Sequence, residues 1–290
     1  MTILAAYGLD ARGPEGLLLA RQLARTGDQR LVVCCVMHNR WQLPTVAHDE
    51  HVRVLARQAE EALAEAREVV GDDAEFVART GQSVAGVLLA EAEAQAARVL
   101  VCGSSAGGPW GHIAVGSVTN RLLHSSTVPI AVAPRGYRVA PDTKIARVTA
   151  GTDNTEAAAS VLLTAARMTR ALGATLRVAT FAVRGRTVYS HRPDAEDAMI
   201  AIWKEQAHER QQAAVRELSR FEDVSFPDEV LIADGRDWHE ALDGIGWQDG
   251  DVLAIGSSGA GLLMRVFVGS TATRILRYSP VPVIVVPRTN

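Results

Sequence analysis

DVLAIGSSGAGLLMRVFVGSTATRILRYSPVPVIVVPR, residues 251–288, has a counterpart earlier in the chain, RVLVCGSSAGGPWGHIAVGSVTNRLLHSSTVPIAVAPR, residues 98–135. The two segments align without a gap, because Gly256 corresponds to Gly103 and Gly269 to Gly116 at the same offset of 153 residues. In both segments an apolar run leads into a glycine-rich stretch, a short helical pattern and a second apolar run. The sequence therefore predicts two copies of one structural unit.

Strand-like and helix-like segments alternate through each copy. Apolar runs predict strands at 3–7, 31–37, 74–79, 98–103 and 128–134, and again at 146–151, 175–183, 228–233, 251–256 and 281–287. Strands that are apolar throughout and separated by helices are typical of parallel sheets covered on both faces. We predict an α/β protein with two tandem doubly wound, Rossmann-like domains, each with a five-stranded parallel sheet.

The domain boundary is expected in PRGYRVAPDT, residues 134–143, which has prolines near both ends and no helical period. We assign residues 1–138 to the first domain and 143–290 to the second. The second copy has about eight more residues than the first, and we expect them at 184–193.

Composition excludes several classes of protein. The 290 residues are 48% apolar and 22% charged with a net charge of −3, so there is no electrostatic case for nucleic acid or an acidic membrane as partner. The segment MTILAAYGLD resembles no signal peptide, and no apolar run has the length of a membrane span. We expect a cytoplasmic protein. Cys34, Cys35 and Cys102 lie in strand-like runs without metal-ligand spacing, and we expect buried, reduced thiols and no metal site.

The glycine-rich stretch 256–271 predicts an anion site. In open α/β sheets, ligands bind beyond the carboxyl ends of the strands. Glycines let the backbone come close to a ligand, and a helix starting near Ser270 would direct free N–H groups at an anion. The stretch is neither a Walker A loop nor a GxGxxG fingerprint.

The spacing in this stretch is G-x2-G-x9-G-S, formed by Gly256, Gly259, Gly269 and Ser270. With the repeat and the strand order, it resembles the universal stress protein family over nearly the whole chain. The resemblance implies an adenine nucleotide alpha hydrolase-like fold and, in tandem members, a pseudo-dimer of the two domains that can pair again into a homodimer. It also implies ATP or a related adenine nucleotide as ligand, with Mg²⁺ as an accompanying ion, and a role as stress sensor or regulator with at most slow ATPase activity.

Site residues follow from the resemblance position by position. An acidic residue after the first strand would contact the adenosine, and here it is Asp153, five residues after Val148. Backbone near Phe181 would line the adenine, although no motif fixes that position. The phosphates would be held by Gly256, Gly259, Gly269, Ser270 and the adjacent Thr271.

The first copy departs from this pattern. Gly8 stands where Asp153 stands in the second copy, and Ala106 replaces the second motif glycine, although Gly103, Gly116 and Ser117 remain. An alanine forced to positive φ would be strained, and we expect Pro109 and Trp110 to stiffen and fill the loop. We therefore expect the second domain to hold the nucleotide and the first to bind weakly.

Three alternatives remain open at this point. Asp153 could only cap the next helix, since it precedes Glu156 by three residues. The chain could also be an interaction module without nucleotide. Finally, GSSAG at 103–107 matches the GxSxG nucleophile elbow of hydrolases with Ser105 as nucleophile, but the elbow requires a helix directly after the serine, and GGPWGH follows instead.

Overall fold

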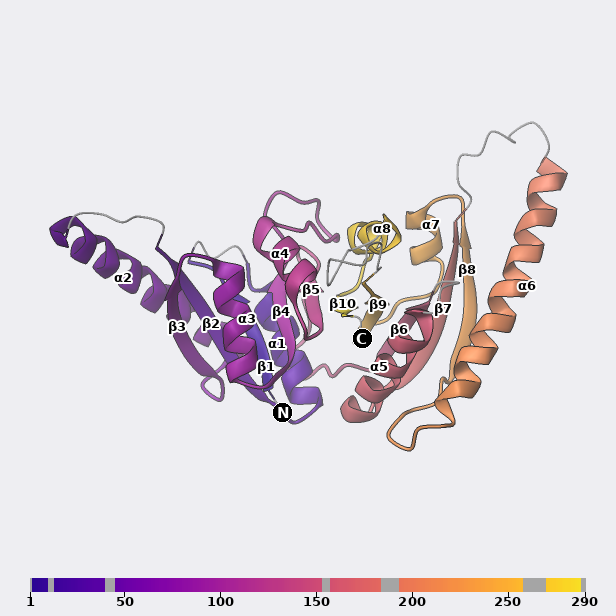
Figure 1. Cartoon of the computed structure of the whole chain (residues 1–290), viewed down its shortest axis with the longest axis horizontal. Helices are drawn as coiled ribbons and strands as arrows, with labels where there is room; N and C mark the ends of the chain where they lie inside the picture. Colours follow the sequence, from indigo (N-terminus) through magenta and orange to yellow (C-terminus); the bar gives the residue numbers. More distant parts are fainter. Residues whose placement is uncertain are drawn as a thin grey trace. The chain divides into compact units, whose positions relative to one another are not determined.

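The computed structural model describes residues 2–9, 13–39, 45–152, 157–183, 193–257 and 270–287. The chain divides into two compact units, Met1–Lys144 and Ile145–Asn290 (Figure 1). The division lies just beyond the linker expected at 134–143. The α/β class with parallel sheets, predicted from the alternating pattern, is confirmed.

Unit 1, the first of the two, has the expected alternation of strands and helices. Its strands are β1 (Thr2–Tyr7), β2 (Arg30–His38), β3 (Glu75–Gly81), β4 (Ala97–Gly103) and β5 (Ile130–Ala133). Its helices are α1 (Glu15–Thr26), α2 (Thr45–Val70), α3 (Val84–Ala94) and α4 (Ser117–Ser125).

Unit 2 repeats this order. Its strands are β6 (Arg147–Thr152), β7 (Thr175–Val183), β8 (Glu229–Gly235), β9 (Asp251–Gly256) and β10 (Val283–Val286). Its helices are α5 (Ala157–Leu172), α6 (Pro193–Leu218), α7 (Trp238–Asp243) and α8 (Ser270–Tyr278).

The strand order reverses in the middle of each sheet. Within unit 1 the order is β3-β2-β1-β4-β5, and within unit 2 the strands follow the corresponding order β8-β7-β6-β9-β10. The pairs β1–β2, β1–β4, β6–β7 and β6–β9 are all parallel. In unit 1, β2 and β3 are added on one side of β1, and β4 and β5 are then added on the other side. Unit 2 is built in the same way around β6. The gap beyond the carboxyl ends of β1 and β4, like that beyond β6 and β9, is the usual ligand position in such sheets.

Helices cover both faces of the unit 1 sheet, as two neighbouring residues of β2 show. Cys35 packs against Ala59 and Ala62 of α2, whereas Cys34 faces a cavity that Leu88 of α3 also lines. Successive side chains of a strand point to opposite faces, so α2 and α3 lie on opposite sides of the sheet. The three cysteines are free and buried, as predicted.

The extra length of unit 2 lies mostly elsewhere than expected. The segment between β7 and α6, residues 184–192, is only three residues longer than its counterpart 39–44 in unit 1. The segment between α6 and β8, residues 219–228, is six residues longer than its counterpart 71–74. The expectation that 184–193 holds all the additional residues was wrong, because overall length alone does not show which loop of a repeat has grown.

Candidate functional site

Unit 1 has a cavity of about 550 Å³ at the point where its strand order reverses. Tyr7 and Gly8 border it from the end of β1, Gly103 from the end of β4 and Ser117 from the start of α4. The volume is within the range of small-molecule sites, and the position is the one expected for a doubly wound sheet.

The floor of the cavity is apolar. It includes Cys34, Leu88 and Cys102, all of which are buried. Burial raises the pKa of the Cys34 and Cys102 thiols to about 12, so both are neutral at physiological pH. The floor therefore suits an apolar ring better than a charged group.

The mouth of the cavity is polar and lies at the N-terminus of α4. Gly116 is the N-cap residue of this helix, and no side chain caps the first turn. The first N–H groups of a helix have no intrahelical acceptor, so those beside Ser117 are oriented to receive an anion or another acceptor. Gly103, Gly116 and Ser117, the three residues predicted for the first domain, all line this one cavity.

The loop between β4 and α4 is held closed by its own hydrogen bonds. The Ser104 hydroxyl accepts from the Ala114 N–H at 2.8 Å, and the Ser105 N–H donates to the Ala114 carbonyl at 2.8 Å. Arg135 donates to the Gly108 carbonyl, and its guanidinium group lies 5.0 Å from the centre of the Trp110 ring. The entrance to the cavity is therefore preorganised.

Two expectations about this loop were wrong. Ala106 has no positive φ, since the described non-glycine residues with positive φ are Asp28 and Ala96. Trp110 is 66% exposed and does not line the cavity, and its ring packs against the Arg135 guanidinium group instead of filling the loop. The loop thus accommodates both residues without the strain inferred from the sequence.

The structure of unit 1 also argues against a nucleophile elbow. Ser105 is exposed and is followed by a turn in which the Gly108 N–H donates to the Ser105 carbonyl at 3.2 Å. The next helix, α4, begins only at Ser117. Ser105 consequently lacks the strand-to-helix turn that presents a hydrolase nucleophile.

Glu15 is a cavity residue that sequence reasoning missed. It is the first residue of α1, is only 8% exposed and lines the cavity. Its Oε1 accepts from the Gly136 N–H at 2.9 Å and lies 3.8 Å from Arg138. An acidic residue after a proline at a helix start is an available sequence signal, but it equally indicates a favourable charge at a helix N-terminus.

In unit 2, the predicted site is only partly within the described residues. Asp153, Gly259 and Gly269 lie outside them. Gly256 is the last residue of β9, and a Cβ there would lie 2.6 Å from Val161 Cγ2, so this glycine lets α5 approach the strand end. Ser270 and Thr271 begin α8, with Thr271 exposed.

Ser257 is a buried polar residue at the start of the glycine-rich stretch of unit 2. It follows β9 directly and is 2% exposed, and within the described part of the chain its hydroxyl has no hydrogen-bond partner. The equivalent hydroxyl of unit 1, on Ser104, is bonded within its loop. A buried hydroxyl without a partner is costly, so a ligand that bonds to it at this strand end would gain affinity.

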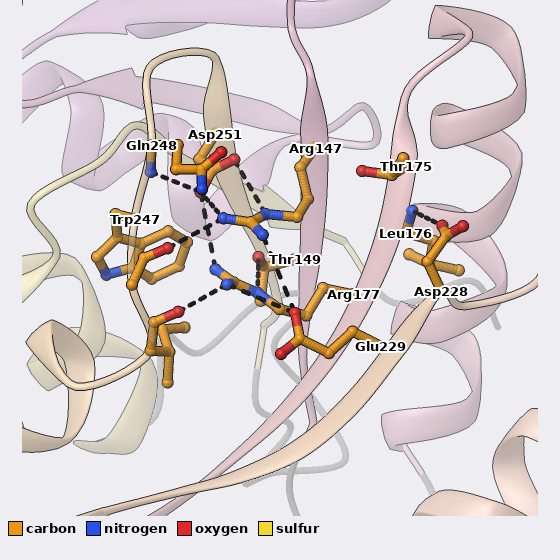
Figure 2. Close-up of polar contacts among 12 residues, drawn as sticks. Arg147, Thr149, Thr175, Leu176, Arg177, Asp228, Glu229, Trp247, Gln248 and Asp251 are labelled. Carbon is orange, nitrogen blue, oxygen red and sulfur yellow. Dashed lines mark hydrogen bonds and ion pairs between the residues drawn. The ribbon is translucent and has the colours of Figure 1, made fainter.

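A buried ion-pair cluster lies at the other end of the unit 2 sheet (Figure 2). Arg147 donates to Asp251 through Nε at 3.1 Å and through Nη2 at 2.5 Å, while the Gln248 N–H donates to Asp251 Oδ2 at 2.9 Å. Arg147 and Asp251 are the first residues of β6 and β9. The cluster thus lies at the amino ends of the strands, away from the candidate ligand site.

Arg177 completes the cluster from the interior of β7, and its side chain is 1% exposed. It donates to Thr149 Oγ1 at 3.0 Å and to the Ile245 carbonyl at 2.7 Å, and it lies over the Trp247 ring at 4.8 Å. Burial, and then the charge of Arg147, lowers its pKa. These contacts fasten the segment between α7 and β9 to the sheet, so the cluster has a structural role.

Neither a metal site nor a membrane helix is found in the described part of the chain. No group of three or more histidine, cysteine, aspartate or glutamate residues there could hold a metal ion. Among the same residues, no helix is long and apolar enough to cross a membrane.

Comparison with known proteins connects this architecture to one family. The sequence profile of the Universal stress protein family matches residues 1–134 and again 144–287. The chain belongs to the universal stress protein family. It is 37% identical to universal stress protein Mb2346c of Mycobacterium bovis and to Rv2319c of Mycobacterium tuberculosis, with 99% of this chain and 100% of each relative covered.

Solved structures agree with the fold. A universal stress protein from Archaeoglobus fulgidus is similar at a TM-score of 0.58 and 19% identity, with 99% of this chain and 98% of that chain covered. A putative universal stress protein from Pseudomonas aeruginosa gives a TM-score of 0.58 at 18% identity, covering 99% and 93%. At these identities the likeness bears on the fold alone, and the resemblance inferred from the glycine motif is confirmed by the family match.

Proposed function

We propose that this universal stress protein binds an adenine nucleotide, ATP in the first instance, and acts as a stress-response sensor or regulator rather than a fast enzyme. The supporting observation is the cavity of unit 1, which lies where two strand ends and a helix N-terminus meet. Unit 2 repeats the same elements in the same order. It adds Asp153 and the complete glycine motif, so we assign the main nucleotide site to unit 2.

The assignment gives each residue a role. Asp153 would accept hydrogen bonds from the ribose, and backbone near Phe181 would border the adenine. The phosphates would be received at the N-terminus of α8, and Ser257, directly after β9, would offer a hydroxyl that has no partner among the described residues. The proposed phosphate contacts are Gly256, Gly259, Gly269, Ser270 and Thr271.

The proposal is tested by calorimetric titration of the purified chain with ATP and by analysis of nucleotide released on denaturation. Asp153→Ala and Gly259→Val should each weaken ATP binding at least tenfold, because they remove a ribose acceptor and obstruct the backbone at the phosphates. Ala106→Val, the matched change in unit 1, should leave ATP binding unaltered. Absence of ATP binding and of released nucleotide would favour the interaction module, and loss of ATP binding in Ala106→Val alone would move the site to unit 1.

Three further expectations stay predictions from the sequence. These are slow ATP hydrolysis at most, a cytoplasmic location, and pairing of the two units as a pseudo-dimer that can form a homodimer. Light scattering coupled to gel filtration measures the last of these directly.

A further inference from the structure

Unit 2 exposes large apolar side chains in the loop between α6 and β8 and at the start of β8 (Figure 1). Phe226 is 54% exposed, and Phe221 and Val230 are exposed as well. These are three of the nine large apolar side chains that are exposed in the described part of the chain, and all lie within ten residues. The corresponding loop of unit 1, residues 71–74, is GDDA and has no apolar side chain larger than alanine. The apolar surface at this position is therefore particular to unit 2.

The backbone that carries these side chains is held in place. The Ser225 N–H donates to the Ala166 carbonyl of α5 at 3.2 Å, and the Asp228 N–H donates to the Leu176 carbonyl of β7 at 2.8 Å. The Leu176 N–H in turn donates to Asp228 Oδ2 at 3.0 Å (Figure 2). Val224, in the middle of the loop, is buried. The exposed rings are thus presented on a fixed backbone, and a preorganised surface loses little entropy when it binds a partner.

The same segment is acidic. Residues 221–230 contain no lysine or arginine and four exposed carboxylates, Glu222, Asp223, Asp228 and Glu229. Asp223 pairs with Arg167 at 2.9 Å, and Glu229 lies 3.9 Å from each of Arg147 and Arg177. Glu222 and Asp228 have no ion-pair partner among the residues that the structure describes. An apolar surface bordered by such carboxylates repels anionic partners and attracts cationic ones.

Pairing of two copies of the chain through this surface is disfavoured. A symmetric dimer would bring identical acidic segments together, and like charges facing each other across an interface are destabilising. Three partly exposed side chains also supply on the order of 300 Å² of apolar contact, well below the ~800 Å² that each partner of a standard complex buries. The surface suits a short segment of another protein better than a second copy.

We propose that residues 221–230 form a docking surface for a basic, amphipathic segment of a partner protein. Apolar side chains of that segment pack on Phe221, Phe226 and Val230, and its lysines or arginines pair with Glu222 and Asp228. The surface lies at the amino end of β8, whereas the nucleotide site proposed for unit 2 lies beyond the carboxyl ends of the strands. The docking surface therefore does not depend on the proposed nucleotide site, and both can be occupied together.

The test measures fluorescence anisotropy of two labelled synthetic peptides titrated with the full chain. One peptide is an amphipathic helix of leucine and lysine, and the other has glutamate in place of every lysine. The double variant Phe221→Ala, Phe226→Ala removes the rings, and Glu222→Lys reverses a charge within the surface. The matched controls lie on exposed positions of α6: Met199→Ala removes another apolar side chain, and Glu205→Lys makes the same charge change. Circular dichroism melting checks that each variant is folded.

We expect the lysine peptide to bind and the glutamate peptide not to bind. The double phenylalanine variant should weaken binding of the lysine peptide about tenfold or more, because aromatic anchors dominate the energy of protein interfaces. Glu222→Lys should weaken it about fivefold at low salt and less at high salt, because salt screens exposed charges. Met199→Ala and Glu205→Lys should each change the affinity by less than about twofold.

Four results would overturn the inference. They are no binding of the lysine peptide, equal binding of both peptides, and losses of affinity in the α6 controls as large as those in the surface variants. The fourth is a dimer of the wild-type chain in sedimentation velocity that the double phenylalanine variant dissociates, since a second copy would then occupy the surface.

Discussion

Replacing Asp251 by asparagine should destabilise unit 2 strongly. The Asp251 side chain is 1% exposed and accepts two hydrogen bonds from Arg147 and one from the Gln248 N–H. Without its charge, Arg147 and the buried Arg177 would face each other with Glu229 as the remaining partner, 3.9 Å from each guanidinium group and half exposed. Removing one partner of a buried ion pair costs about 3 to 5 kcal/mol.

We expect the lower end of this range, because the Arg147 side chain is 19% exposed and can be partly hydrated. A loss of about 3 kcal/mol in the free energy of unfolding lowers the melting temperature of a domain of this size by about 10 °C. Urea denaturation followed by circular dichroism and by fluorescence, to which Trp247 in the cluster contributes, measures the change.

The control is Asp223→Asn, which breaks an ion pair with Arg167 whose side chains are 63% and 48% exposed. That change should cost less than about 1 kcal/mol, since exposed pairs contribute little. If Asp251→Asn proves no more destabilising than Asp223→Asn, the cluster does not hold the segment between α7 and β9 in place, and the structural reasoning is refuted.

Further predictions concern unit 1. Gly16→Val should cost about 2 kcal/mol by backbone collision with Gly103, whereas Gly107→Ala, which meets nothing within 4 Å, should be neutral in the same melting experiment. Ser83→Ala should cost about 1 kcal/mol, because the Ser83 hydroxyl caps α3 by accepting from the Gly86 N–H at 3.2 Å; an unchanged urea midpoint would show that the cap contributes nothing. The three cysteines have folded-state pKa values raised by burial to about 11 or 12 from 9.0. The thiol contribution to stability should therefore be fully present below about pH 9 and be lost as the pH rises toward 12. Alkylation at pH 8 should be fast only after denaturation, and rapid labelling of the native chain would contradict this.

The sequence predicted the architecture well because the fold depends on patterns that repeat. The constant offset between Gly103 and Gly256 identified two units, and the apolar runs identified the strands in each. The parallel order and the reversal point follow from general rules for alternating strands and helices. The cavity of unit 1 accordingly lies where a doubly wound sheet should have one.

The details that escaped prediction depend on which side chains meet in space. Arg177 stands out in TLRVATFAV as a charge in an apolar strand, yet its partners Thr149 and Asp251 come from two other strands. From the sequence, Glu15 indicates only the start of a helix. Its place at the cavity depends on the hydrogen bond from the Gly136 N–H, which lies 121 residues later in the chain. The exposed position of Trp110 likewise depends on Arg135, whose place beside it no local pattern specifies.

Two strand positions of the buried ion-pair cluster have aliphatic counterparts in unit 1. Where unit 2 has Thr149 and Arg177, the equivalent strand positions of unit 1 are Leu4 and Val32, both fully buried. The two units therefore fill equivalent buried strand positions with different side chains, aliphatic in unit 1 and hydrogen-bonding in unit 2. Urea does not screen ion pairs, whereas guanidinium chloride is a salt and does. The two denaturants therefore need not unfold the two units in the same order.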